Sequence, residues 1–164
     1  MKTLYVVRHA KSSWDDTHVS DFERPLNHRG SRDAPRMGRF LAEQGIRPDR
    51  LVSSPALRAL TTARAIADAL GYPANDIDEE PALYDAGADA VVNIVRGFAD
   101  AWSSAMIFGH NPGFTSFVNT LTQSNLGNVP TCAVAKIRVQ SDRWSQLGES
   151  PASLVEFYIP KEIE

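Results

Sequence analysis

Arginine and histidine side chains follow apolar runs at three separate places in the sequence. These residues are Arg8 and His9, Arg58, and His110. A neutral imidazole nitrogen can attack phosphorus, and the planar guanidinium fork matches phosphate oxygens in bidentate fashion. Taken one at a time, each histidine is more often a structural hydrogen-bonding residue. The chemistry that the set predicts, if its members converge, is the binding and transfer of a phosphoryl group.

Composition limits what kind of protein could carry such a site. The chain has 164 residues, of which 43% are hydrophobic and 23% charged, and its net charge is -3 with no long block of like charges. We therefore expect one domain over residues 1–164, with no bulk electrostatic binding to nucleic acid or to a membrane surface. Cys132 is the single cysteine, which excludes an internal disulfide. No apolar stretch suits a membrane span or a secretory signal, and we expect a soluble, cytoplasmic protein.

Short apolar runs and amphipathic segments alternate along the chain. The predicted strands cover residues 3–7, 50–53, 105–108, 132–139 and 153–159, the last two joined by a turn that carries Trp144. The predicted helices run between the caps Asn27 and Gly45, from a Ser54 cap with Pro55 at the first helical position to Gly71, over 89–99, and over 114–121. The alternation favours an α/β fold in which helices cover a sheet.

The helical spacing also identifies core positions. Ala34, Met37 and Leu41 share one face of the first helix. In the second helix the residues expected to face the core are Leu57, Leu60, Ile66 and Leu70.

The predicted sheet brings the four chemical residues to one edge. In open α/β sheets, ligands bind in the crevice outside the carboxyl ends of the strands, which is where Arg8, His9 and His110 stand. Arg58 falls in the first turn of a helix, where free backbone N–H groups and the helix dipole favour an anion. We therefore predict a small positive pocket suited to phosphate.

Six segments in order carry a resemblance that covers nearly the whole chain. They read RHAKSSW, ERPLNHRG, SSPALRALTTA, LYDA, GHNPG and PTCAVAKI. Together they resemble the histidine phosphatase superfamily, which includes the phosphoglycerate mutases, and in particular its short SixA-type phosphohistidine phosphatase branch. The resemblance implies a three-layer α/β sandwich with a mixed, mostly parallel central sheet between helices. It also implies a single domain without a cap insertion.

The same resemblance assigns roles to residues. It implies that His9 is the nucleophile and that Arg8, Arg58 and His110 bind the phosphoryl group, joined by Arg24. The phosphoryl group would pass to His9 and then to water, with the arginines meeting the developing charge. No metal or cofactor is expected, because arginines take the place of a divalent clamp. The histidines also lack metal-binding spacing.

The general acid is the least determined part of this site. The superfamily commonly has glycine after the nucleophile and an L-x-E acid, whereas this chain has Ala10 and places Asp85 in LYD. Asp85 is the candidate acid, with Asp15 and Glu80 as competitors. A phosphohistidine substrate relaxes the need for an acid, because its leaving imidazole differs from an alkoxide. Asn111 stands where the acid-phosphatase branch has an aspartate.

Cys132 and Arg138 offer a rival interpretation. Five residues separate them, as in the signature of cysteine-dependent tyrosine phosphatases. That loop must wrap phosphate with backbone N–H groups, yet the intervening residues form a glycine-free β-type run. We therefore interpret Cys132 as a buried small hydrophobe, with a change in the pocket floor as the alternative. No Walker loop is present.

Several polar and aromatic residues near the motifs could have purely structural or surface roles. Arg24 alone could be a solvated surface charge, and Lys11 is expected to be exposed. Trp14 is expected to pack against the core, with a place at the pocket mouth as the alternative. His18 and His28 match no motif and are expected on the surface.

The substrate follows least directly from the sequence. Without an insertion long enough for a lid, the pocket should be open and admit a phosphorylated protein side chain. The first hypothesis is a phosphatase for phosphohistidine on a protein such as a histidine phosphotransfer domain. The second is a small-molecule phosphomonoesterase, and the third a phosphate-binding module without turnover. A mutase would need a closed site to protect its intermediate from water.

Overall fold

Six strands and four α-helices form the regular structure of residues 1–163, which the computed structural model describes. The strands are β1 (Lys2–Arg8), β2 (Arg50–Ser53), β3 (Asp78–Glu79), β4 (Ser104–Gly109), β5 (Val134–Val139) and β6 (Ala152–Tyr158). The helices are α1 (His28–Glu43), α2 (Leu57–Leu70), α3 (Ala88–Arg96) and α4 (Gly113–Thr122). No helix in this part of the chain combines the length and hydrophobicity of a membrane span.

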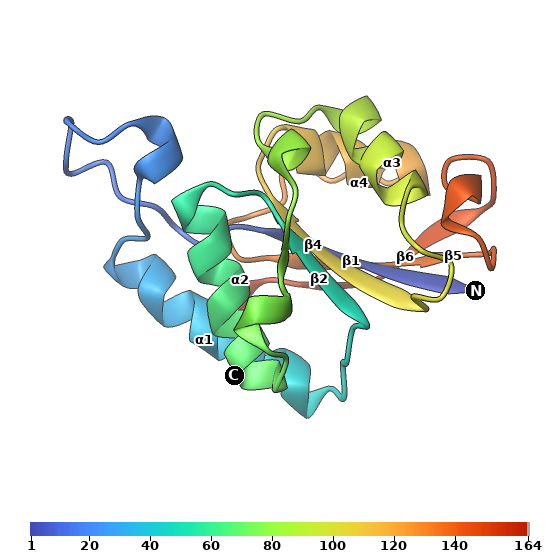
Figure 1. Ribbon diagram of the computed structural model, residues 1–164, viewed down its shortest axis with the longest axis horizontal. Helices are drawn as coiled ribbons and strands as arrows, with labels where there is room; N and C mark the ends of the chain where they lie inside the picture. Colours follow the sequence, from blue (N-terminus) through green and yellow to red (C-terminus); the bar gives the residue numbers. More distant parts are fainter. Residues whose placement is uncertain (164) are drawn as a thin grey trace.

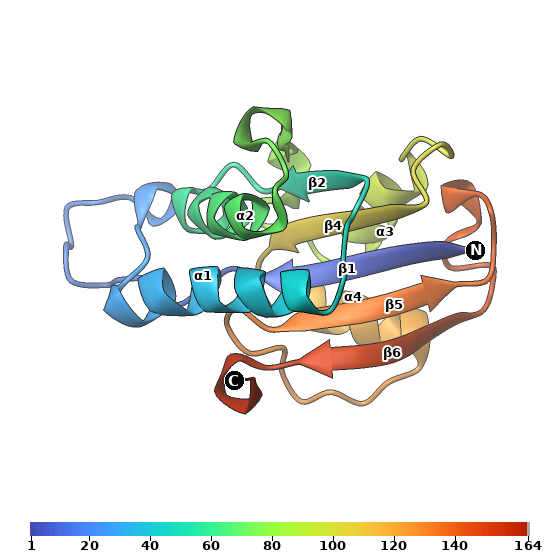
Figure 2. The ribbon, with the colours of Figure 1, turned by 90° about the horizontal axis from the view of Figure 1, so that it is seen from below.

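The strands make one mixed sheet in the order β3-β2-β4-β1-β5-β6. Figure 1 shows this sheet between the helices, and Figure 2 shows β2, β4, β1, β5 and β6 side by side in that order. The pairs β3–β2, β2–β4 and β4–β1 are parallel, while β5 runs antiparallel to both of its neighbours. Parallel neighbours need crossover connections, which the helices supply. Figure 2 shows the arrowheads of β1, β2 and β4 at one edge, facing the loop between β1 and α1.

Helices cover both faces of the sheet, so the fold is the three-layer α/β sandwich that the sequence predicted (Figures 1 and 2). Alternate residues of β1 divide between two cores, as the period of a strand requires. Leu4 and Val6 pack in a cluster with residues of α3 and α4. Tyr5 and Val7 pack in a second cluster with residues of α1 and α2. Because both faces are buried, β1 reads as a continuous apolar run.

The first helix agrees closely with its sequence signals. Asn27 caps α1, and its side-chain oxygen accepts a hydrogen bond of 2.9 Å from Gly30 N. Gly45, just beyond the helix, has a φ of 75°, which glycine adopts without strain. Ala34, Met37 and Leu41 are fully buried, as predicted.

The start of the second helix differs from the prediction. Helix α2 begins at Leu57 with Ala56 as its cap, so Ser54 is not the cap. Ser54 instead accepts a hydrogen bond from Ala56 N and reaches His110. Leu57, the first residue of the helix, is 38% exposed rather than in the core. Leu60 and Ile66 are buried as expected.

Gly30 of α1 lies where the helix meets the segment after β1. A Cβ at this position would stand 2.1 Å from the Lys11 carbonyl oxygen, so the backbone would have to move. We expect Gly30→Ala to lower the free energy of unfolding by about 1–3 kcal/mol, as overpacking does. Gly127→Ala is the control, because a Cβ there meets no heavy atom within 4 Å. Equal losses in denaturant unfolding of the two variants would contradict this account of the contact.

Candidate active site

The pairing of β1 with β4 places two histidines side by side. In this parallel pair Arg8 lies opposite Gly109, and His9 N donates a hydrogen bond of 3.0 Å to the Gly109 carbonyl oxygen. His9 and His110 are therefore the first residues beyond the two strands, and their ring centroids are 5.2 Å apart. The parallel strand ends thus bring the two histidines side by side.

The predicted phosphate ligands converge on a cavity of about 190 Å³ at this edge. Its lining includes Arg8, His9, Arg24, Arg58 and His110, which come from four segments of the chain. The Thr62 hydroxyl strengthens this arrangement, because it accepts a hydrogen bond from Ala10 N and donates one to the Arg58 carbonyl oxygen. The structure brings all five residues together, and their catalytic roles stay predictions.

A hydrogen bond fixes which nitrogen of His9 carries a proton. His9 Nδ1 lies 2.7 Å from the Ala10 carbonyl oxygen, and a carbonyl oxygen can only accept. Nδ1 therefore bears the hydrogen, and Nε2 of the neutral ring holds the free lone pair. This is the tautomer that a nucleophile attacking through Nε2 needs.

Burial keeps both site histidines neutral. Desolvation, reinforced by neighbouring charges, lowers the pKa of His9 to about 3, although the hydrogen bond to Ala10 acts in the opposite direction. Desolvation and the nearby Arg58 lower the pKa of His110 to about 4. At neutral pH both rings are uncharged, which leaves the arginines as the positive charges of the cavity.

Three buried nitrogens of the site have no hydrogen-bond partner among the described residues. They are Arg8 Nε, Arg58 Nε and His110 Nδ1. Buried polar groups are nearly always paired, and leaving one unpaired costs about 1–3 kcal/mol. All three belong to residues that line the same cavity. Unpaired N–H donors around one cavity are expected in a pocket that is preorganised to bind an oxyanion.

Arg24 is a buried site residue and not a solvated charge. It is 7% exposed, and its Nη1 donates hydrogen bonds to Ser12 Oγ at 2.8 Å and to the Ser13 carbonyl oxygen at 3.3 Å. Its guanidinium carbon lies 3.4 Å from the centroid of the Trp14 ring. Trp14 is 70% exposed, so the expectation that it packs against the core is wrong. The ring instead covers Arg24 at the mouth of the cavity.

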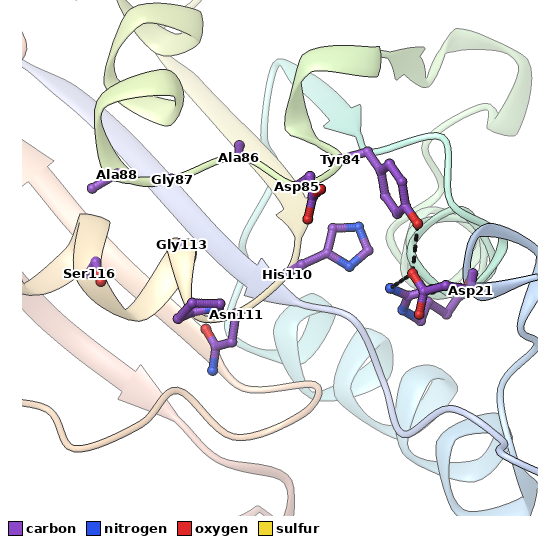
Figure 3. A pocket seen from close by; sticks show the side chains of 12 residues that line it. Asp21, Tyr84, Asp85, Ala86, Gly87, Ala88, His110, Asn111, Gly113 and Ser116 are labelled. Atoms are coloured by element: carbon purple, nitrogen blue, oxygen red, sulfur yellow. Dashed lines mark hydrogen bonds and ion pairs between the residues drawn. The ribbon is translucent and has the colours of Figure 1, made fainter.

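A second cavity, of about 490 Å³, adjoins the first and shares Arg58, His110 and Asn111 with it. Figure 3 shows Asp85 on its wall with the carboxyl group toward His110. Asp85 is exposed and has a φ of 65°. Its two competitors line neither cavity: Asp15 is exposed, and Glu80 caps a turn by accepting a hydrogen bond from Ala82 N.

Sequence reasoning missed Asp21 and Tyr84. The Asp21 carboxylate contacts Arg24 and Arg58, and it accepts a hydrogen bond of 2.7 Å from the Tyr84 hydroxyl (Figure 3). Hydrogen bonds from Tyr84 and then from Arg58 lower the pKa of Asp21 to about 2. The available signals were an acidic residue three positions before Arg24 and, for Tyr84, its place in the LYDA segment beside Asp85.

Cys132 plays the structural part that the sequence suggested. Its side chain is fully buried, and desolvation raises the pKa of its thiol to about 12. Arg138 stands exposed on β5, opposite Thr3 of β1, and does not join Cys132 around an anion. The Cys132 backbone N–H does contribute to the site, because it donates to the carbonyl oxygens of Arg8 and His9.

The remaining residues singled out in the sequence lie outside this arrangement or at its rim. His18 and His28 are exposed, as predicted, and exposed Lys11 lies at the rim of the smaller cavity. Within residues 1–163, no three His, Cys, Asp or Glu side chains are grouped closely enough to hold a metal ion.

Comparison with known proteins identifies the class to which this fold and site belong. The sequence pattern of the histidine phosphatase superfamily (branch 1) matches residues 4–91. This segment contains β1, α1, β2 and α2 with their site residues. The chain is a member of that superfamily.

Two uncharacterized relatives match over most of the chain, and a mutase matches over about half of it. An uncharacterized chloroplastic protein of Arabidopsis thaliana is 28% identical over 153 residues, which is 88% of this chain and 70% of the relative. An uncharacterized protein of Mycobacterium leprae is 28% identical over 167 residues, covering 94% of this chain and all of the relative. A 2,3-bisphosphoglycerate-dependent phosphoglycerate mutase of Chelativorans is 35% identical over 83 residues, 49% of this chain and 40% of the mutase.

Solved structures point more narrowly to the SixA-type branch. SixA from Agrobacterium tumefaciens superposes with a TM-score of 0.81 and 25% identity, covering 97% of this chain and 98% of that one. The protein histidine phosphatase SixA in complex with tungstate has a TM-score of 0.82 and 21% identity, with 97% of both chains covered. The predicted superfamily and SixA-type branch are thus confirmed.

The buried histidines should make stability depend on pH. In the unfolded chain an imidazole binds a proton below about pH 6.5, whereas His9 and His110 stay neutral in the fold down to about 3 and 4. The unfolded state therefore binds more protons, and the free energy of unfolding should fall as the pH is lowered from about 6.5 toward 5. Denaturant unfolding across this range measures the slope. His9→Asn should lower this slope by the amount that corresponds to the uptake of about one proton on unfolding. An unchanged slope would contradict the burial of a neutral His9.

Proposed function

We propose that this chain is a phosphatase that removes the phosphoryl group from phosphohistidine on a protein, through a covalent phosphohistidine intermediate on His9. One observation supports the proposal most directly. His9, with its lone pair on Nε2, lines the same cavity as Arg8, Arg24 and Arg58, and three buried nitrogens of residues in this lining have no hydrogen-bond partner among the described residues. Membership of the superfamily and the likeness to SixA structures support the same reading.

In the first step the His9 Nε2 lone pair forms a bond to phosphorus, and the bond from phosphorus to the leaving nitrogen breaks. The electron pair of that bond goes to the leaving nitrogen, which then takes up a proton. The arginines and His110 stabilise the charge on the three transferred oxygens. In the second step a water molecule attacks phosphorus, which releases inorganic phosphate and returns the electron pair to Nε2.

Asp85 is the proposed proton donor to the leaving group, because it is the one predicted carboxylate that lines the adjoining cavity. An imidazole leaving group makes this donor less necessary than an alkoxide would. Asp85→Asn should therefore slow turnover of an alkyl phosphomonoester by at least about tenfold and leave phosphohistidine turnover within a factor of about three. Steady-state rates on both substrates measure the contrast, and equal losses would count against the assignment.

Two alternatives use the same cavity. A small-molecule phosphomonoesterase is favoured by the second cavity of about 490 Å³, which has room for a small leaving group. A binding module without turnover is disfavoured, because it has no need of a nucleophile held in the reactive tautomer. No metal is assigned in any of these readings, since arginines supply the positive charge.

The substrate test compares a phosphohistidine-bearing phosphotransfer domain with a panel of sugar and glycerate phosphates. We expect kcat/KM to favour the domain by at least about tenfold, which is roughly 1.4 kcal/mol of barrier. A preference for any small phosphate would favour the small-molecule phosphomonoesterase. Binding of phosphate without turnover of either class would favour the binding module.

The nucleophile has a separate test in a trapped intermediate. After brief reaction and quenching, the wild-type chain should carry an acid-labile, base-stable phosphoryl group, and His9→Ala should carry none. Cys132→Ser is the matched control, because its buried thiol with a raised pKa has no role in the reaction. Loss of the intermediate in the cysteine variant, with retention in the histidine variant, would reverse the assignment.

A further inference from the structure

Asp21 makes three hydrogen bonds with two arginines of the site, although the proposed mechanism gives it no part in the reaction. It lies in a 3-10 turn, Asp21–Glu23, in the loop between β1 and α1. Its Oδ1 accepts from Arg24 Nε at 3.2 Å, and its Oδ2 accepts from Arg58 Nη2 at 3.1 Å. Its backbone carbonyl oxygen accepts from Arg58 Nη1 at 2.6 Å. One residue thus holds two guanidiniums from distant segments.

These contacts determine which part of Arg58 is left for a ligand. Both terminal nitrogens of Arg58 are turned to Asp21, while its Nε is buried without a partner among the described residues. An arginine side chain has several rotatable bonds, and its orientation in a cavity must be fixed by what it contacts. Asp21 is the residue that makes those contacts, and Arg24 is held to the same carboxylate through its Nε.

Tyr84 fixes Asp21 in turn. Its hydroxyl donates to Asp21 Oδ2 at 2.7 Å (Figure 3). Its ring lies edge-on to both Phe22 and His110, with centroids 5.1 Å and 5.6 Å away. The carboxylate therefore has a partner on each side and stays ionised through the neutral range, with its pKa near 2. Tyr84 belongs to the wall of the larger cavity, so the chain of contacts joins both cavities.

We propose that Asp21 is a positioning residue, which with Tyr84 orients Arg24 and Arg58 so that their free N–H groups meet the transferred phosphoryl oxygens. Asp21 touches neither substrate nor phosphorus in this role. It acts through the arginines, as a supporting shell does for a preorganised site. The inference deepens the proposed phosphatase function and rests on it for its kinetic readout.

The test compares Asp21→Asn with Glu23→Gln, which removes a carboxylate from the same turn. Glu23 is exposed and accepts only from Ser20 Oγ among the described side chains. We expect Asp21→Asn to lower kcat by about tenfold to a hundredfold with KM changed less than about threefold, because misplaced donors weaken transition-state stabilisation most. Glu23→Gln should keep both constants. Unchanged kcat in Asp21→Asn, or an equal loss in Glu23→Gln, would overturn the proposal.

Tyr84→Phe supplies a second variant that keeps the carboxylate and the ring. It should lower kcat in the same direction by a smaller factor, and the double variant with Asp21→Asn should lose less than the product of the two separate losses. Fully multiplicative losses would show that Tyr84 does not act through Asp21. If Asp21→Asn proves poorly stable, Tyr84→Phe alone still tests the proposal, because it removes the hydrogen bond to Asp21 Oδ2 while keeping the carboxylate and the ring.

A spectroscopic readout separates this proposal from the proposed function. In NMR spectra, the Arg58 Nε–H signal of the wild-type chain should exchange slowly and move when orthovanadate binds. In Asp21→Asn the signal should exchange rapidly and orthovanadate should bind at least about tenfold more weakly. If the wild-type chain hydrolyses no phosphate substrate but the two proteins still differ in exchange rate and orthovanadate affinity, the phosphatase function alone is rejected. If Asp21→Asn has the exchange rate and the orthovanadate affinity of the wild-type chain, the positioning role alone is rejected.

Discussion

The parallel pairing of β1 with β4 is the constraint on which the site depends. It sets His9 and His110 at the first positions beyond two adjacent strands, and the hydrogen bond from His9 N to the Gly109 carbonyl oxygen continues the ladder up to His9. Because both strands are buried on both faces, a slip of one residue would turn Leu4 and Val6 from one core to the other. The hydrophobic pattern that fixes the register therefore also fixes the distance between the two imidazoles.

The site is built at a cost in stability that the two cores offset. Burial holds two imidazoles neutral and leaves three nitrogens without a partner among the described residues, each an unfavourable arrangement within the fold. The same arrangement is what a phosphoryl group would relieve, since its oxygens accept hydrogen bonds from unpaired N–H groups. Desolvation thus serves two ends: it keeps the lone pair of His9 available, and it strengthens each interaction with a charged ligand.

Much of the fold could be predicted because its signals are local. The apolar runs gave the strands, and Asn27 and Gly45 bounded the first helix as capping chemistry requires. The convergence of His9, Arg58 and His110 followed from strand order, since carboxyl ends of parallel strands share an edge. The predicted start of α2 was wrong because Ser54, although serine is a common capping residue, forms hydrogen bonds with Ala56 N and His110 Nε2 through its hydroxyl. Propensity cannot show which of two partners a side chain takes.

The loop between β1 and α1 shows where sequence reasoning ends. Arg24, Trp14 and Asp21 have no periodicity, and their roles depend on contacts between side chains that no local rule supplies. Yet these contacts complete the charge balance of the site. With both imidazoles neutral, the three arginines and Asp21 leave two net positive charges. Two positive charges match a phosphoryl group of about two negative charges at neutral pH. Asp21 thus limits the positive charge of the pocket to about the charge that a phosphoryl group would balance.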